Sequence, residues 1–447
     1  MFKNTSRPKQ DEMWIRSEDL VSAHTNPFYD KLKKMLNEIK FGDQVRKICS
    51  EHYRCDGPGQ PGVDPEVYFK MLIIGFFQNI TSERELERRC HDSISIREFL
   101  GYNLTERTPD HSTLSVIRLR LSSETFDKIF QIMLPVLQKH GLIIGKNVGM
   151  DSSVMEANAS MRALQNRLTK EQYRKYVSNL AKEDGVDPND PAAVSRYDRK
   201  RKKKVSNTEW ENPHDSEAKI GPTKHGNTRM IYKPEHLVDM DTGAILDAQV
   251  QPGDMADCTN VTDRLMKSEM FAAEGLNNDE MDLPLESFTA DKGYHSDDEI
   301  VELSGYDIQA NIPDRLTTRR LEKMKEEKRE IIEASINFVS SEDGKELLRK
   351  RGMYIERSFA HVLDSGGMRR TTLRGQENIQ KRYIIAAMGF NISLVMGKIY
   401  GYGTPKQHDA GNETALYLFL IDKRVVVLLY LRSECFQGVI FVFVYYH

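Results

Sequence analysis

The sequence predicts an α/β protein, α+β overall, in which an all-helical amino-terminal region precedes a mixed sheet flanked by helices. Two patterns predict this fold. Apolar residues recur at helical spacing over about residues 20–140. From Gly145 onward the period becomes that of strands, with a hairpin and a strand–helix–strand unit further along the chain. The 447 residues leave room for two or three domains, at roughly 150 residues each.

The composition is that of a globular protein. Hydrophobic residues make up 39% of the chain, charged residues make up 29%, and the mean hydropathy is -0.57, which excludes a polytopic membrane protein and a wholly disordered chain. The 64 Lys and Arg residues nearly balance the 67 Asp and Glu residues, so any affinity for a polyanion must come from local clusters of charge. The first residues lack the apolar core of a signal peptide and the five cysteines are odd in number, so we expect a cytoplasmic protein.

One group of cysteines has a spacing that zinc ligands could use. Cys49, His52 and Cys55 are followed by Cys90 and His91, and thiolates and imidazoles are zinc ligands. The sequence lacks the paired Cys-x2-Cys knuckle that is usual in structural zinc sites. Ordinary buried thiols are therefore the favoured interpretation.

Three helix starts can be recognised in the first region. The dipeptide Asp64-Pro65 offers an N-cap followed by proline at the first helical position. Ser82 with Glu85 has the pattern of a capping box, and Ser122 or Ser123 can cap a further helix. These signals predict an all-α domain.

A strand is predicted over Val148–Val154. Strand side chains alternate between faces, so Met150 and Asp151 should point to opposite sides of the sheet. The polar stretch from about residue 160 to 221 contains Asp-Pro breakers and a basic run. It is predicted to be an insertion or a mobile loop.

A hairpin with its turn at Gly243 is predicted over His236–Val250. After it, Ser287–Ala290 predicts a strand that ends at Asp291, and a short helix leads to a second strand at Tyr306–Ile312. Two strands joined by a helix should be parallel. Asp291 would then lie at the carboxyl end of its strand, where α/β sheets bind their ligands.

A charged helical segment, Arg319–Glu333, separates this unit from an apolar helix. Glu356 lies beside the buried stripe predicted for that helix. The stripe consists of Ile355, Phe359, Val362 and Leu363.

Three acids differ from most other carboxylates because they lie in apolar elements: Asp151, Asp291 and Glu356. A carboxylate in such a place is costly unless it is paired or binds a metal, and three from separate elements could converge on two hard cations. Two Mg²⁺ ions about 4 Å apart activate an attacking oxygen on one side of a phosphorus and stabilise the leaving oxygen on the other. On composition alone, the alternative is that the aspartates are turn or capping residues.

The segments around these acids resemble the three acidic blocks of the DDE transposases of bacterial insertion sequences. Val148–Ser153 is similar to the first block and Ala290–Tyr294 to the second. Tyr354–Phe359, followed by Gly366–Thr371, is similar to the third. The resemblance covers about residues 20–395.

This resemblance implies a ribonuclease-H-like catalytic core and a metal-dependent transposase. By the family's pattern, Asp151 lies on the first core strand and bridges two Mg²⁺ ions, for which Mn²⁺ substitutes. Asp291 follows the fourth strand and Glu356 lies on the helix after the fifth, and each holds one ion. Such an enzyme cleaves phosphodiester bonds at the terminal inverted repeats of its element and joins the 3′-hydroxyl to target DNA. Synapsis of two ends implies a homodimer or a larger assembly.

The chain departs from the family in its auxiliary residues. Some relatives carry a Tyr and an Arg at fixed spacing before the Glu, and a Lys about two turns after it. Here Arg349 and Arg351 precede Glu356, and Leu363 occupies the lysine-like position, so the roles of these residues stay open. Glu377 is the rival third acid, and its alternative interpretation is a helix-surface carboxylate.

The basic residues predicted to contact DNA form three groups: one on a helix of the first region, one in the polar stretch, and one beside the acids. Guanidinium and ammonium groups in such places bind phosphates in a salt-sensitive way. The structural alternatives are ion pairs with nearby acids and a solvated loop. The predicted residues are Arg84, Arg88, Arg89, Arg199, Lys200, Arg201, Lys202, Lys203, Lys204, Lys292, Arg357, Arg369 and Arg370.

We therefore predict a helical DNA-binding domain over residues 1–140, a ribonuclease-H-like catalytic domain over 141–400 and an apolar tail over 401–447. The apolar runs of the tail are too short for a membrane span, so we expect β-forming segments and no membrane partner. The tail lies outside the resemblance, and a frameshifted or decayed end is one hypothesis for it. The alternative functions are a ribonuclease-H-like nuclease that cuts without joining and a DNA-binding protein whose catalytic core has decayed. A transposase of this kind would work at the nucleoid, in the cytoplasm of a prokaryotic cell.

Overall fold

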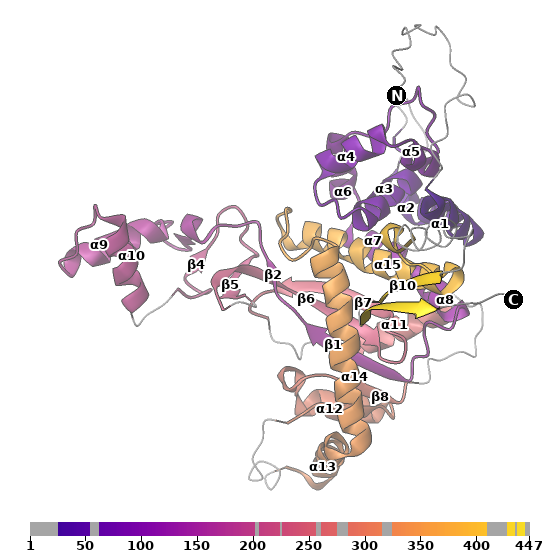
Figure 1. Cartoon of the computed structure of the whole chain (residues 1–447). Helices are drawn as coiled ribbons and strands as arrows, with labels where there is room; N and C mark the ends of the chain where they lie inside the picture. The colour runs from indigo at the N-terminus through magenta and orange to yellow at the C-terminus, as the bar shows by residue number, and fades with distance from the viewer. Residues whose placement is uncertain are drawn as a thin grey trace, which may run out of the picture.

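A computed structural model gives the fold of the chain (Figure 1). It describes residues 26–53, 62–201, 205–223, 226–255, 261–274, 285–314, 324–408, 427–433 and 436–442. Within these ranges, a helical region packs on a mixed sheet with its covering helices, and an arm projects from the end of the sheet (Figure 1).

The amino-terminal region is all-helical, as the sequence predicts. Its helices bury one shared apolar core, in which aromatic rings from several helices meet edge to face. The described helices are α1 Pro27–Glu38, α2 Phe41–Cys49, α3 Pro65–Phe77, α4 Glu83–Asp92, α5 Ile94–Leu100, α6 His111–Arg120, α7 Ser123–Gln131 and α8 Met133–Lys139.

Two of the predicted caps are confirmed and one is wrong. Asp64 accepts a hydrogen bond from a backbone amide in the first turn of α3, and Ser122 does the same in α7. Ser82 precedes α4 but makes no side-chain capping bond. Its expected partner Glu85 pairs instead with Arg88, so the capping box does not form.

The central sheet is mixed. Its strands are β1 Asn147–Ser152, β2 Met155–Glu156, β5 Lys219–Pro222, β6 Thr228–Asp239, β7 Ile245–Pro252, β8 Ser287–Thr289 and β9 Gln309–Asn311. They lie in the order β7, β6, β1, β8, β9, with β2 and β5 beside the first half of β6. The β6–β7 and β1–β6 pairs are antiparallel, whereas the β1–β8 and β8–β9 pairs are parallel. The predicted hairpin and the predicted parallel unit are thereby confirmed, and the sheet is consistent with a ribonuclease-H-like core.

Helices cover both faces of this sheet. They are α11 Val261–Glu274, α12 Asp297–Gly305, α13 Glu326–Ser340, α14 Glu342–Phe359 and α15 Gln376–Tyr400. α14 crosses one face and continues into a π-helical turn, Ala360–Ser365 (Figure 1). α11 lies on the other face, and α15 runs along β7. Part of the charged segment predicted at Arg319–Glu333 lies outside the described residues, and its remainder enters α13.

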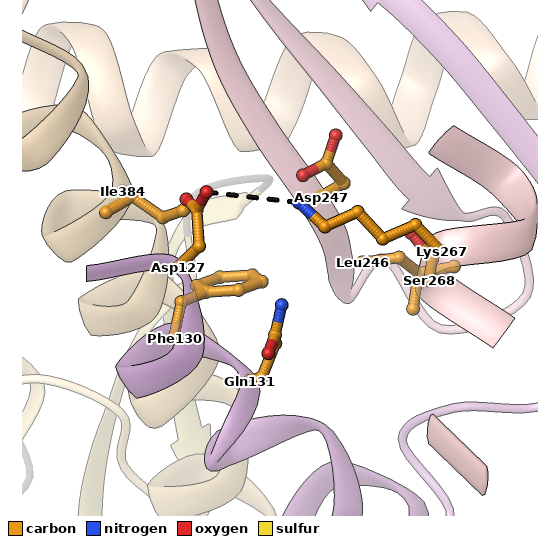
Figure 2. A pocket seen from close by; sticks show the side chains of 8 residues that line it. All are labelled: Asp127, Phe130, Gln131, Leu246, Asp247, Lys267, Ser268 and Ile384. Atoms are coloured by element: carbon orange, nitrogen blue, oxygen red, sulfur yellow. Dashed lines mark ion pairs between the residues drawn. The ribbon is translucent and has the colours of Figure 1, made fainter. Parts of the chain in front are cut away.

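α15 joins the sheet to the helical region. Lys381 Nζ donates a hydrogen bond to the carbonyl of Arg118, and the adjacent Arg382 donates to the carbonyl of Ile80. Residues of α7, β7, α11 and α15 line a small pocket at this junction, where Asp127 Oδ2 lies 3.9 Å from Lys267 Nζ (Figure 2). The helical region is therefore in direct contact with the elements of the sheet.

The polar stretch forms a folded arm that projects away from β2 and β5 (Figure 1). The arm contains β3 Gln165–Asn166, α9 Tyr173–Glu183, α10 Pro191–Lys200 and β4 Trp210–Glu211. Its core is aromatic, since the Trp210 ring lies 4.9 Å from Tyr173 and 5.2 Å from Tyr176. The expectation of a mobile loop is therefore wrong for the described part, because these rings hold α9 against β4.

Two features concern the carboxyl-terminal part of the chain. Gln376–His408 is long and apolar enough to cross a membrane by length and composition, but 61% of its apolar window is buried inside the protein. Its apolar side chains pack against β7, α3 and α7, so a position in the core accounts for them. β10 Val427–Ser433 and β11 Phe436–Val442 form an antiparallel pair, as the β-forming pattern of the tail predicts.

Candidate active site

Asp151 and Asp291 stand at the ends of two neighbouring parallel strands. β1 pairs with β8 so that Gly149 lies opposite Thr289. Asp151 lies two residues further along β1, and Asp291 lies two residues after the last residue of β8, where the backbone is still extended. Because alternate residues share a face and neighbouring strands lie about 4.8 Å apart, the two aspartates occupy adjacent positions at one edge of the sheet. The structure brings together these two of the three predicted acids.

Asp151 points to the face that α14 covers. Arg351 Nη1 of α14 donates a hydrogen bond to Asp151 Oδ2 at 2.6 Å. The preceding residue, Met150, contacts Arg264 of α11 on the opposite face, with 3.9 Å between sulfur and Nη1. The predicted alternation of these two side chains is confirmed.

Three contacts fix the course of α14 across the sheet. Near its start, Asn311 of β9 donates to a backbone carbonyl of α14 at 3.0 Å. In its second half, Ile355 packs closely over Gly149 of β1, where an added Cβ would lie 3.2 Å from Ile355 Cδ1. Ser358 Oγ then lies 2.7 Å from Nδ1 of His236 on β6. The helix therefore passes over the strand that carries Asp151.

The electrostatics of Asp151 favour a cation. Burial raises the pKa of Asp151 most strongly, and the negative charge of Asp291 raises it further. The Arg351 guanidinium and the Ser152 amide act in the opposite direction. Two carboxylates at one half-buried edge repel each other, so a positive charge beside them is stabilising.

Glu356, the third predicted acid, does not converge with Asp151 and Asp291 in this structure. Glu356 lies exposed on α14 beside the predicted stripe, in which Ile355 is 0% and Phe359 is 6% exposed. Among the described residues, no three His, Cys, Asp or Glu side chains converge so as to hold a metal ion. The rival acid Glu377 lies in the first turn of α15, where it is 63% exposed and pairs with Lys381 at 2.7 Å, as a helix-surface carboxylate would.

His236 belongs to this site, and the sequence reasoning missed it. It pairs with Asp151 across β1 and β6 and is fully buried. Ser358 donates its hydroxyl hydrogen to Ile355 O, so His236 Nδ1 donates to Ser358, and Nε2 accepts from the Tyr383 hydroxyl at 2.6 Å. Burial lowers the pKa of His236 to about 3, so its ring is neutral. The available signal was a lone histidine at the start of the predicted hairpin His236–Val250, which in the structure lies near the end of β6.

Arg369 has a structural role beside the acids. It pairs with Asp364 at 2.8 Å and donates from Nη1 to Ser153 Oγ at 3.1 Å. These bonds tie the segment after the π-helical turn to the end of β1. The other predicted basic residues of this group are exposed: Lys292, Arg357 and Arg370.

The basic residues of α4 lie on its solvent side. Arg84, Arg88 and Arg89 are all exposed. Arg84 and Arg88 line an open pocket between α4 and α6, together with Glu87 and His111. Glu87 accepts hydrogen bonds from the His111 amide and Nδ1, and these bonds lower the pKa of Glu87.

The basic run of the arm is only partly described. Arg199 and Lys200 are exposed at the end of α10. Arg201 pairs with Asp198 at 3.1 Å and lies over the Tyr176 ring at 5.7 Å, which is a structural role. Lys202–Lys204 lie outside the described residues.

The two cysteines in the described residues fit the interpretation as buried thiols. Cys49 and Cys90 are fully buried, and burial raises the pKa of each to about 12. His52 Nε2 lies 2.9 Å from Thr125 Oγ1. Cys55 lies outside the described residues.

Comparison with known proteins gives two matches, both to family models. A Transposase domain (DUF772) matches residues 16–120, and a Transposase DDE domain matches residues 205–392. The second range includes Asp291 and Glu356 and begins after Asp151. No curated protein and no solved structure matches the chain.

Proposed function

Since the chain belongs to the DDE transposases, we propose that it moves an insertion sequence. It binds the ends of its element, hydrolyses a phosphodiester bond at each end and joins the freed 3′-hydroxyl to target DNA. Both steps are in-line displacements at phosphorus, with water and then a DNA hydroxyl as the nucleophile. Asp151, Asp291 and Glu356 are the proposed catalytic acids.

The adjacent positions of Asp151 and Asp291 carry this proposal. They follow from the register of β1 with β8. Asp291 Oδ1 accepts a hydrogen bond from the Gly293 amide at 2.7 Å. Asp291 therefore caps the turn Lys292–Tyr294, as the alternative interpretation expected, and this bond holds its carboxylate at the strand end. Glu356 is on the helix that passes over β1. Two acids at one sheet edge with a third on the covering helix fit the three-acid pattern better than they fit isolated turn residues.

DDE transposases use divalent metal ions, and the donors present here fit such ions. Carboxylate oxygens are the ligands that Mg²⁺ prefers, and a cation would relieve both the burial of Asp151 and its repulsion by Asp291. Asp151, Asp291 and Glu356 would hold two Mg²⁺ ions, with Mn²⁺ as a substitute. When bound, the ions activate the attacking oxygen and stabilise the leaving one.

The chain's basic residues would hold the DNA. Lys292 and Arg357 are exposed and follow Asp291 and Glu356 directly in the chain, and Arg370 is exposed after the π-helical turn. We assign these three side chains to the phosphates next to the scissile bond. Arg84, Arg88 and Arg89 of α4 would bind the element ends. Arg199 and Lys200 at the end of α10, and Lys202–Lys204 after them in the sequence, would add further phosphate contacts. Arg369 supports the site by fastening its own segment to Ser153.

The assembly and its location follow from the reaction. Two element ends must be held together, so we propose at least a homodimer on DNA. The substrate is chromosomal DNA, so the protein would act at the nucleoid, in the cytoplasm of a prokaryotic cell.

A cleavage assay on DNA that flanks the encoding gene tests the function. Purified protein with Mg²⁺ or Mn²⁺ should cut at a discrete inverted-repeat boundary, and Asp291→Asn, Glu356→Gln or removal of metal should abolish cutting while end binding persists. Glu346→Gln is the matched control, because Glu346 lies on the same helix and is 60% exposed. Full cleavage by Glu356→Gln would contradict its assignment, and loss of cleavage in Glu377→Gln alone would favour the rival acid.

Product analysis with a target plasmid separates the alternatives. A transposase gives joined products. Cleavage without joining would indicate a ribonuclease-H-like nuclease, and specific binding without metal-dependent cleavage would indicate a decayed catalytic core.

A further inference from the structure

Arg351 occupies the position beside the aspartate pair where a cation is needed. Its Nη1 lies 2.6 Å from Asp151 Oδ2, and the two side chains are only 17% and 23% exposed. A guanidinium in contact with Asp151 offsets the cost of burying that carboxylate next to Asp291. Arg351 therefore does for the carboxylates what a bound metal ion would do.

Arg351 pairs with fewer carboxylates than Arg264, the arginine on the other face of this sheet. Arg264 binds two carboxylates, Glu235 at 2.6 Å and Asp247 at 2.8 Å. Arg351 binds the single carboxylate of Asp151. Within the described ranges each guanidinium also has one buried nitrogen without a hydrogen-bond partner, Nε in Arg351 and Nη2 in Arg264. With one carboxylate instead of two, the Arg351 pair is the easier one to exchange.

If a metal ion replaces Arg351 at Asp151, side chains must move, whereas α14 itself can stay in place. Ile355 is fully buried and Ser358 is bonded to His236, so α14 stays fixed on the sheet. Gly352 provides free space one turn before Glu356, because an added Cβ there would meet no atom within 4 Å. Glu356 shares that side of α14, so its side chain can change rotamer without disturbing packed neighbours.

We propose that Arg351 is the resident counter-ion of the metal-free site, and that a divalent cation binds Asp151 only by displacing it. This inference rests on the proposed function, since it takes Asp151 and Asp291 as metal ligands. Two cations then compete for one carboxylate. The affinity for metal is set by the strength of the Arg351–Asp151 pair as well as by the acids, and the protein can fold with a neutralised site before metal arrives.

Mn²⁺ binding to the full-length, DNA-free protein tests the competition. The free ion is followed by electron paramagnetic resonance during a titration. Arg351→Gln removes the competitor, so the dissociation constant for Mn²⁺ should fall about tenfold, which corresponds to about 1.4 kcal/mol. Thermal unfolding gives a second readout. Without metal, Arg351→Gln should have a lower Tm than the parent protein, and saturating Mn²⁺ should raise the Tm of Arg351→Gln by more than it raises the Tm of the parent protein.

Two further variants keep the test independent of folding defects. Arg349→Gln removes an exposed arginine from the same helix and should leave the Mn²⁺ affinity unchanged. Arg351→Lys keeps a cation but loses the planar fork, so it should fold like the parent protein and show an intermediate gain in affinity.

The outcomes separate this inference from the proposed function. If Asp151→Asn loses Mn²⁺ binding but Arg351→Gln binds no more tightly than the parent protein, the competition is overturned and the metal site stands. If neither Asp151→Asn nor Asp291→Asn weakens Mn²⁺ binding, these acids are not the ligands, and the inference and the proposed function both fail.

Discussion

Ser358 Oγ lies 2.7 Å from Nδ1 of His236, and this bond fastens the helix that carries Glu356 to the strand paired with Asp151. The other ring nitrogen of His236 accepts a hydrogen bond from the Tyr383 hydroxyl of α15 at 2.6 Å. One donor and one acceptor are therefore needed from the same ring, and only the neutral imidazole supplies both. The alignment of α14 depends on a histidine that stays uncharged.

The free energy of unfolding should fall as the pH is lowered from about 6.5 towards 3. In the folded protein, burial lowers the pKa of His236 to about 3. The pKa of a histidine in an unfolded chain is about 6.5. Between these values the unfolded state binds one more proton than the folded state. The contribution of His236 to the free energy of unfolding is fully present above pH 6.5. It falls by ~1.4 kcal/mol for each unit by which the pH is lowered below 6.5. Chemical denaturation at several pH values measures it.

His236→Gln is the variant that isolates this contribution, because an amide keeps a donor and an acceptor but does not titrate in this range. The difference in unfolding free energy between the parent protein and His236→Gln should shrink as the pH falls, since the other titrating groups cancel in the difference. His91→Gln, which changes an exposed histidine, should show no such trend. A constant difference between parent and His236→Gln across the range would contradict the burial argument.

Asp127 should act on stability in the opposite direction. Burial raises the pKa of Asp127 to about 6, although Lys267 Nζ lies 3.9 Å away (Figure 2). The folded state binds more protons than the unfolded state from about pH 4 to 6, so the contribution of Asp127 is fully present below pH 4 and is lost as the pH rises through 6. Asp127→Asn should therefore stabilise the protein at pH 8, by on the order of 1–2 kcal/mol.

Thermal unfolding of Asp127→Asn at pH 4 and at pH 8 checks the sign. The gain in Tm over the parent protein should appear at pH 8 and disappear at pH 4. Glu124→Gln on the same helix is the control, since Glu124 is 74% exposed. A loss of stability at pH 8 would mean that the attraction of Lys267 outweighs the burial of Asp127.

Gly389 should tolerate no side chain where α15 crosses α3. A Cβ at this position would lie 2.3 Å from Phe76 Cδ1, which is a ring carbon and not the flexible end of a side chain. Gly389→Ala should cost about 1–3 kcal/mol through overpacking, measured by chemical denaturation. Gly305→Ala is the matched control, because nothing lies within 4 Å of its added Cβ at the end of α12, and it should be neutral or slightly stabilising. Equal effects of the two substitutions would contradict the packing argument.

Local patterns predicted the positions of the two aspartates. Alternation along β1 sets the face of Asp151, and the helix between β8 and β9 makes these strands parallel, with Asp291 after the first. These features depend on neighbours within one element or one crossover. A single chain carries that information in its periodicity.

Contacts between distant segments could not be predicted in this way. Arg351 and Asp151 are far apart in sequence, and nothing in either local pattern indicates that they pair. The same holds for His236 with Ser358, and for the rings of Tyr173 and Trp210 that fold the arm. The partners in these contacts are set by how elements pack. The sequence therefore indicated the acids but not the cation beside one of them.

DNA binding should depend on the exposed arginines of α4. Glu87 is bonded to His111, and Arg88 pairs with Glu85 on the exposed side of α4. Arg84 and Arg88 lie one turn apart at the rim of an open pocket. If each contacts one phosphate, the slope of log K against log salt should become shallower by about 0.9 in each alanine variant. Arg46→Ala removes the same charge from α2, outside this pocket, so its slope should stay that of the parent protein. Fluorescence anisotropy with an inverted-repeat duplex at several KCl concentrations measures this, and unchanged slopes in Arg84→Ala and Arg88→Ala would exclude α4 from the DNA interface.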